Sequence, residues 1–357
     1  EQVSENGLEP TAAPVVIDPV AQTPGPRDAD LEATEPAVEV VETAEATDAP
    51  FDLDQAPLYA PLPPGAGPVS GPLRFAPSRG VLVDLSGDGT SLALADLSGG
   101  AVGLGVDAYY PMWSESGTLG FAYYPAGEDQ PSIGAWSPGS GIVTRLTTQD
   151  GVGGDHRDVP AGWVGGDLYY ERTFPDESGG RVELRRVRGD GSNDALVWED
   201  DGVQVTSAHP FPVSGGFAIA TSGGWLLVQD GTASGLGAVT LGGRISQLEV
   251  GPGGWTAYAD GQSIAVVGSQ NFDSVVSVLP FSEDPGAGFS WSPDGARLAV
   301  TDSAGLAIFD AASGAELASW SSEGLVGAPL WTAEGVLFVR GGPDAAIHLL
   351  PADAIDS

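Results

Sequence analysis

The densest group of side chains that could do chemistry lies at residues 155–158, in an insertion between two predicted strands. Loops on a rigid scaffold commonly carry binding residues, and Tyr and Arg are frequent interface anchors. The predicted register places a Tyr-Tyr pair on the neighbouring connection. We therefore predict a partner-binding surface of six residues: Tyr109, Tyr110, Asp155, His156, Arg157 and Asp158. The alternative is that the tyrosines pack at the start of a strand and that 155–158 is a solvated loop.

The sequence gives little support for a metal site. It has no Cys and only three His, at positions 156, 209 and 348, whose spacing does not match a metal triad. Asp190 to Asp194 places oxygen ligands at alternating positions, as in a calcium loop. Ala195 stands where such a loop needs Gly, and a strand-like run follows, so a plain hairpin is the better interpretation. We predict no metal and no cofactor.

Catalytic motifs are also missing. The sequence contains no nucleophile elbow, P-loop or dinucleotide-binding fingerprint in a fitting strand–helix context. Its carboxylates are many and scattered, so no catalytic pair can be chosen. We predict no catalytic residues and a protein that is not an enzyme. The alternative is a lactonase- or glycosidase-like hydrolase that uses carboxylates in a central channel.

These residues must be positioned by a repeated unit, which is clearest at residues 289–320. Four short apolar runs are separated there by turns rich in Gly, Pro, Asp and Ser, which is the pattern of an antiparallel meander. Similar units of about 40 residues recur along the chain. Each has a Gly at the turn between its first two runs: Gly80, Gly117, Gly166, Gly216, Gly254, Gly295 and Gly335.

The repeats predict an all-β fold, a seven-bladed β-propeller of four-stranded antiparallel blades. The first blade is expected over residues 71–106. The last blade lacks a fourth strand, because residues 353–357 are too polar to form one. We predict that Leu58 to Leu62 supplies it beside Ala346 to Leu350, which would remove two exposed sheet edges.

The residues Trp291-Ser292-Pro293-Asp294-Gly295, followed by an apolar strand, resemble the repeat of TolB-like, WD40-like (PD40-type) propellers. The turns Asp310 to Gly314 and Asp96 to Gly100 resemble the turn that closes the third strand of that repeat. The resemblance covers residues 71–350 and is strongest in the sixth unit. It implies a propeller that binds a protein or a ligand.

The predicted domains are a disordered acidic tail at 1–55, rich in Ala, Pro and Glu, and a propeller at 56–357. Low hydrophobicity with high net charge does not repay the entropy of ordering the tail. The net charge of −36, with 13 basic residues that are all Arg, makes nucleic acid a poor partner. No apolar run is long enough for a membrane helix, so we predict no membrane insertion.

Together these features predict a non-catalytic scaffold that binds a protein or small-molecule ligand at one propeller face. A structural subunit of a surface assembly is a further alternative. The expected location is extracytoplasmic, that is, periplasmic, cell-surface or secreted. The acidic surface favours a neutral or cationic partner over an anionic one.

Overall fold

The computed structural model describes residues 51–62, 67–68, 80–84, 91–96, 101–148, 155–174, 180–201, 205, 210–239, 241–281, 287–302, 304–341 and 344–356. They belong to a compact unit that begins at Pro50. Residues 1–50 of the predicted tail lie outside the described residues, so the tail and its boundary stay predictions.

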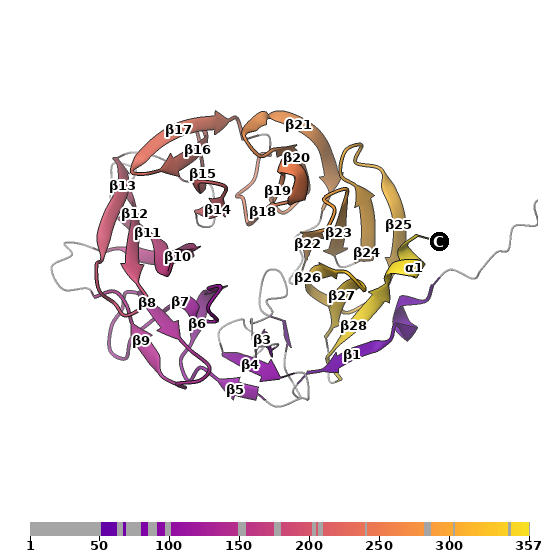
Figure 1. Ribbon diagram of the computed structural model, residues 1–357, viewed down its shortest axis with the longest axis horizontal. Coiled ribbons are helices and arrows are strands. Elements are labelled where there is room, and N and C mark those ends of the chain that lie inside the picture. Colours follow the sequence, from indigo (N-terminus) through magenta and orange to yellow (C-terminus); the bar gives the residue numbers. More distant parts are fainter. Residues whose placement is uncertain are drawn as a thin grey trace, which may run out of the picture. The chain divides into compact units, whose positions relative to one another are not determined.

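Six four-stranded antiparallel sheets stand around a central axis as full propeller blades (Figure 1). Blade two is β6 (Ala108–Trp113), β7 (Leu119–Tyr123), β8 (Ser132–Trp136) and β9 (Val143–Arg145). Blade three is β10 (Arg157–Val164), β11 (Asp167–Phe174), β12 (Arg181–Arg188) and β13 (Ala195–Asp201). Blade four is β14 (Phe211–Val213), β15 (Gly216–Thr221), β16 (Gly224–Gln229) and β17 (Thr232–Gly237).

The remaining full blades follow the same order from the axis outward. Blade five is β18 (Gln247–Val250), β19 (Trp255–Ala259), β20 (Ser263–Gly268) and β21 (Asn271–Pro280). Blade six is β22 (Gly288–Trp291), β23 (Arg297–Asp302), β24 (Gly305–Asp310) and β25 (Glu316–Ser321). Blade seven combines β26 (Leu325–Thr332), β27 (Gly335–Arg340) and β28 (Ala346–Pro351) with β1 (Leu58–Pro61).

The prediction of seven full blades is wrong for the first unit, which is a reduced sheet. It consists of β2 (Gly67–Pro68), β3 (Gly80–Asp84), β4 (Leu92–Asp96) and β5 (Ala101–Gly103). Its inner strand has two residues and pairs with β3 at only two positions. Gly adds no packing side chain and Pro donates no ladder hydrogen bond, so this strand is weak. The predicted start of the blade, at 71–79, lies outside the described residues.

The predicted closure of blade seven is confirmed. β1 pairs antiparallel with β28, from Leu58 opposite His348 to Pro61 opposite Ala346. Residues after β28 form a short helix, α1 (Ala352–Ile355), and not an outer strand. Leu53, in the 3₁₀ turn η1 (Leu53–Gln55), is buried in the same apolar cluster as strands of blades six and seven. The sheet therefore takes strands from both ends of the described chain.

The core lies between neighbouring blades. In blade six, the first two strands bury Phe289, Leu298 and Val300 against residues of blade five. Such burial on both faces explains the nearly continuous apolar runs in the sequence. A second 3₁₀ turn, η2 (Pro252–Gly254), precedes β19. No helix among the described residues has the length and apolar character needed to cross a membrane.

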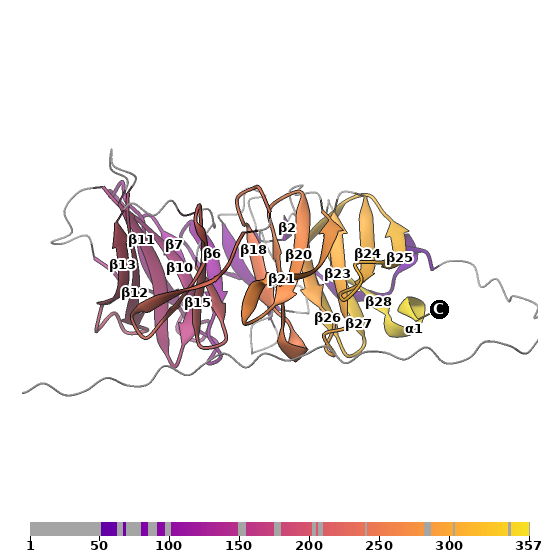
Figure 2. The same ribbon diagram turned by 90° about the horizontal axis from the view of Figure 1, so that it is seen from above.

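The strands run between two faces of the ring, as the edge-on view shows (Figure 2). In an antiparallel meander, alternate connections emerge on the same face. The β7–β8 connection and the β9–β10 connection therefore share one face, which we call the loop face. This is the face that carries the candidate site.

Candidate binding site between blades two and three

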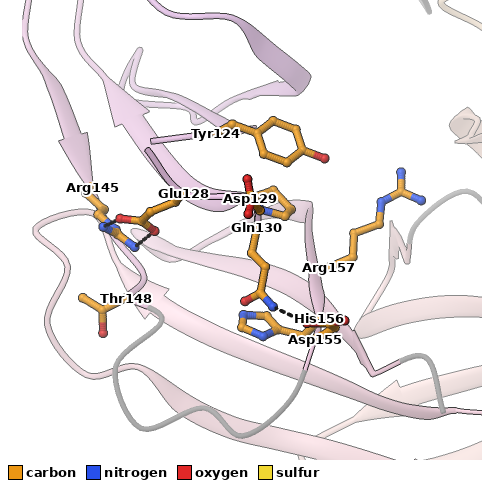
Figure 3. Close-up of a pocket in the computed structure, with 10 residues that line it drawn as sticks. Tyr124, Glu128, Asp129, Gln130, Arg145, Thr148, Asp155, His156 and Arg157 are labelled. Carbon is orange, nitrogen blue, oxygen red and sulfur yellow. Dashed lines mark hydrogen bonds and ion pairs between the residues drawn. The ribbon is translucent and has the colours of Figure 1, made fainter. Parts of the chain in front are cut away.

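A pocket of about 820 Å³ opens on the loop face between blades two and three. Residues of three segments line it: 124–131 after β7, 145–148 at the end of blade two, and 155–157 at the start of blade three (Figure 3). Its volume is in the range of sites that bind small molecules, about 300–1,000 Å³. Two pairs of polar side chains in these segments contact each other, Arg145 with Glu128 and Gln130 with Asp155.

One wall of the pocket is fixed by an ion pair. Arg145 donates from Nη1 and Nη2 to the two carboxylate oxygens of Glu128, at 2.6 and 2.7 Å. Its Nε donates to the carbonyl oxygen of Thr147 at 2.7 Å. Two parallel N–H···O bonds give such a pair geometric definition as well as energy. The β7–β8 connection is thereby tied to the outer strand of its own blade.

The opposite wall joins the two blades. Gln130 Nε2 donates to Asp155 Oδ1 at 3.2 Å, a contact between the β7–β8 connection and the start of blade three that Figure 3 shows as a dashed line. Tyr124 is 52% exposed and meets the ring of Tyr109 edge to face, with the ring centroids 6.0 Å apart. The pocket therefore offers an aromatic surface beside carboxylates.

Arg157 and Tyr110 come together as the sequence predicts for neighbouring connections. Arg157 Nη2 donates to the Tyr110 hydroxyl, and the guanidinium lies 5.5 Å from the centroid of the ring. Tyr110 has φ of 52°, and the register of β6 shifts between Tyr109 and Met112. Such bulges re-aim side chains and are frequent next to functional sites. A bulky residue at positive φ is strained, and such strain also clusters at functional sites.

A buried ion pair supports the start of blade three. Arg172 donates from Nε and Nη2 to the two oxygens of Asp158, each at 2.7 Å, and both side chains are almost fully buried. Thr147 Oγ1 donates to Asp158 as well, at 3.3 Å, so the pair also touches blade two. Burial alone would lower the pKa of Arg172, but the bonds and the charge of Asp158 more than offset it, so that pKa is raised.

The six predicted residues thus have different positions. Asp155 and Arg157 are exposed at the pocket, and His156 lines it but is buried, with its ring 5.8 Å from that of Phe174. Tyr109 and Tyr110 are half-buried and reach the pocket through Tyr124 and Arg157. Asp158 is buried and is not among the residues that line the pocket; its carboxylate pairs with Arg172. Whether these residues bind a partner stays a prediction.

Sequence reasoning missed the wall formed by residues 124–131. A usable signal was present, because a Gly-Glu-Asp-Gln run stands between Pro125 and Pro131, directly after an apolar strand. It also missed the buried charges of β11, where Glu171 and Arg172 look like surface residues in a short polar stretch. Only the position of the strand in the sheet shows that they are enclosed.

The structure locates the other candidates from the sequence. Asp190 to Asp194 forms the turn between β12 and β13, with Asp190 Oδ1 accepting hydrogen bonds from Ser192. His348 lies on β28, with Nδ1 3.0 Å from the carbonyl oxygen of Ala56. His209 lies outside the described residues. Within the part of the chain that the structure describes, no group of three or more His, Cys, Asp or Glu could hold a metal ion.

No family model matches the chain, and no curated protein matches its sequence. Solved structures do match. The oligogalacturonate lyase of Vibrio parahaemolyticus has a TM-score of 0.57 at 13% identity, over 81% of this chain and 92% of that one. A chain of the mitotic checkpoint complex has a TM-score of 0.56 at 13% identity, over 91% and 99%. The fold is a β-propeller.

A third matching propeller was solved with a bound small molecule. An inactive virginiamycin B lyase from Staphylococcus aureus, solved with quinupristin, has a TM-score of 0.53 at 12% identity, over 80% of this chain and 96% of that one. At such identities the likeness shows the fold and does not transfer an activity. The WD40-like resemblance of the sequence agrees with these matches.

The prediction that the protein is not an enzyme must be corrected. It rested on the absence of catalytic motifs and on the resemblance to propellers that bind a protein or a ligand. Two of the matched propellers are lyases, so this fold accommodates catalysis. A missing motif therefore does not exclude an activity here.

Proposed function

We propose that this propeller recognises a cationic side chain of a partner protein in the loop-face pocket between blades two and three. The observation that carries the proposal is that the exposed ring of Tyr124 lines the same pocket as the carboxylates of Asp129 and Asp155. An aromatic face with nearby carboxylates suits a guanidinium or ammonium group, through cation–π attraction and charge-assisted hydrogen bonds. The protein already holds one guanidinium against an aromatic ring, since Arg157 lies over the ring of Tyr110.

The charge of the whole chain supports the same class of partner. A net charge of −36 attracts cationic surfaces over a distance and raises their association rate at low salt. The Glu128–Arg145 pair supports the proposal in another way. It holds the β7–β8 connection in one place, so less ordering entropy is lost when a partner binds.

The test compares two peptides that differ only in charge, acetyl-Gly-Gly-Arg-Gly-Gly-amide and its citrulline analogue, by isothermal titration calorimetry; the capped ends carry no charge that titrates. We expect the arginine peptide to bind more tightly. The Asp129→Asn and Asp155→Asn variants should each weaken its binding by about tenfold, because each removes a charge-assisted partner. Glu316→Gln, an exposed charge change on β25 in blade six, is the matched control and should bind like the parent. Equal binding of both peptides would refute the proposal.

A second candidate is a reaction at Glu171 of β11, a buried carboxyl that is not among the residues lining this pocket. Burial in apolar surroundings raises the pKa of its carboxyl to about 7, against its ordinary 4.5. A carboxyl that titrates near neutrality is suited to proton transfer. Turnover assays on oligogalacturonate and on aryl ester substrates test this candidate. An activity that is lost in Glu171→Gln supports it, and no turnover of any substrate argues against it.

An extracytoplasmic location remains our proposal for the setting of this binding. A chain without Cys tolerates an oxidising compartment, because it cannot form unwanted disulfides. Fractionation of the native cells with an antibody against the propeller tests the location. Recovery in the cytoplasmic fraction alone would refute it.

A further inference from the structure

Glu171 is a buried carboxylate that only partly meets its hydrogen-bonding needs. It lies on β11 and is 6% exposed. Oε1 accepts a hydrogen bond from Thr173 Oγ1 at 3.0 Å, whereas Oε2 has no hydrogen-bond partner within the described structure. An ionised oxygen without a donor is costly in such a place. Glu171 is therefore stable as a neutral acid, or as an anion that has found a cation.

Arg157 is a cation on the same side of the sheet as Glu171; Arg186 of β12 is on that side too, and its guanidinium lies 4.0 Å from the carboxylate of Asp167. β10 and β11 pair with Arg157 opposite Thr173 and Val159 opposite Glu171. Residues two apart on one strand face the same way, so Arg157 and Glu171 are diagonal neighbours. Diagonal neighbours have Cα atoms about 7–8 Å apart, a distance that long side chains bridge. In this structure the guanidinium of Arg157 bonds to Tyr110 instead.

The other surroundings of Glu171 supply few alternatives. Leu184 of β12 lies opposite Glu171 and packs against Phe217 and Ile219 of blade four. The described strands of blade four carry no ionisable side chain that faces it. Arg244, in the connection before β18, is the second described cation whose charge reaches Glu171. Desolvation raises the pKa of Glu171 to about 7, and the bond from Thr173 and the charges of Arg157 and Arg244 oppose that rise.

We propose that Glu171 sets the position of Arg157 and thereby makes the loop-face pocket sensitive to pH. A neutral Glu171 leaves Arg157 on Tyr110, at the mouth of the pocket. An ionised Glu171 competes for the same guanidinium and draws it along the sheet, away from Tyr110. Glu171 is thus a positioning residue, and Arg157 is the group that moves.

This inference rests on the proposed function where it concerns the partner. Drawing Arg157 inward removes a positive charge from the pocket mouth. A cationic partner should therefore bind more tightly as the pH rises through 7, and a neutral one should be unaffected. The movement of Arg157 itself does not depend on any partner.

The movement can be followed by NMR of the guanidinium groups, because the chain has only 13 basic residues, all of them Arg. Protein labelled with ¹³C and ¹⁵N at arginine is titrated from pH 5.5 to 8.5. The signal missing from Arg157→Lys identifies Arg157. We expect a transition of that signal with a midpoint near pH 7, absent in Glu171→Gln and kept in Asp155→Asn, a nearby carboxylate used as the control.

A second variant keeps the test decisive if Glu171→Gln does not fold. Thr173→Val removes a hydrogen bond that favours the ionised carboxylate, so the midpoint should move up by about one pH unit. No transition in the parent, a transition that persists in Glu171→Gln, or an unmoved midpoint in Thr173→Val would each overturn the inference.

The peptides used above separate this inference from the proposed function. The arginine peptide should bind about fivefold more tightly at pH 8.5 than at pH 5.5, and this difference should vanish in Glu171→Gln. The citrulline peptide should show no pH dependence. If neither peptide binds, the proposed function fails while the NMR titration still decides whether Glu171 controls Arg157. If the arginine peptide binds equally at both pH values, the coupling of Arg157 to the pocket is wrong.

Discussion

Blades three and six are built from the same four-stranded unit and use it in opposite ways. Blade six follows the repeat closely, and the buried polar side chains among its described residues are hydroxyls: Ser290, Ser292, Thr301 and Ser322. Blade three has longer strands and buries four charged side chains: Asp158, Glu171, Arg172 and Glu183. It also carries six of the thirteen arginines of the chain: Arg157, Arg172, Arg181, Arg185, Arg186 and Arg188.

The difference separates a blade whose buried side chains stabilise the fold from a blade whose buried charges lie beside a candidate binding site. Buried charges cost desolvation free energy, and apolar residues of similar size would often stabilise a sheet at least as well. Residues whose type does not suit their position in the fold, such as charged residues in a core, are expected mainly at functional sites. The pocket borders blade three, and the described residues of blade six include no buried charged side chain. Three experiments test this contrast.

The largest effect is expected from Arg172→Met in blade three. The change leaves Asp158 buried without its cation and should lower the free energy of unfolding by about 3–5 kcal/mol. Urea denaturation measures it. The matched control is Arg297→Met in blade six, whose pair with Asp356 is partly exposed and should contribute at most about 1 kcal/mol. Equal losses for the two variants would end the contrast between the blades.

The next effect depends on pH. Here the substitution, Glu171→Gln, is expected to raise the free energy of unfolding and not to lower it. The folded state raises the pKa of Glu171 from 4.5 to about 7, so the folded protein holds this proton more tightly than the unfolded chain does. The stability that Glu171 contributes is therefore present below pH 4.5 and is lost as the pH rises to 7.

Replacing this residue should remove that dependence. At pH 8, Glu171→Gln should be more stable than the parent, by about 3 kcal/mol at most, and at pH 4.5 the two should be nearly equal. Thermal unfolding at the two pH values measures the difference. A parent that gains stability relative to the variant as the pH rises would reverse the assignment.

The smallest effect concerns the turn of blade six. Gly295 has φ of 72°, and a Cβ atom there would lie 2.4 Å from the carbonyl oxygen of Pro252. Gly295→Ala should cost about 2 kcal/mol, from backbone strain and from the shift that the contact forces. Gly324→Ala is the control. Gly324 has φ of 77° and open space around it, so its replacement should cost only the free energy of backbone strain. Indistinguishable losses in urea denaturation would show that the turn is not held against η2.

The sequence predicts the ring well, because each blade repeats a local pattern. The turn around Gly295 and the apolar runs beside it depend only on neighbours in the chain. The closure by β1 is also predictable, since one blade lacked a strand and one spare run remained. The inner strand of the first unit was missed because Gly67–Pro68 has neither periodicity nor apolar side chains.

The site was predictable only in part. The Tyr and Arg residues of neighbouring connections could be placed together from the register, and Arg157 does reach Tyr110. The wall at 124–131 and the burial of Glu171 depend on how two blades pack, which one chain segment does not encode. The pairing of Asp158 with Arg172 likewise joins two strands whose register the sequence leaves open.

The closing strand also has a consequence for synthesis on the ribosome. The segment around β1 is made early, yet its partner around His348 is 292 residues further along, as the contact from Ala56 shows. At about 5–20 residues per second, the nascent chain must wait roughly 15–60 s before that partner exists. During this delay β1 is an unpaired edge that could join a wrong sheet. Pro57 before it and Pro61 at its end lack N–H donors, which shortens the stretch that premature pairing could use.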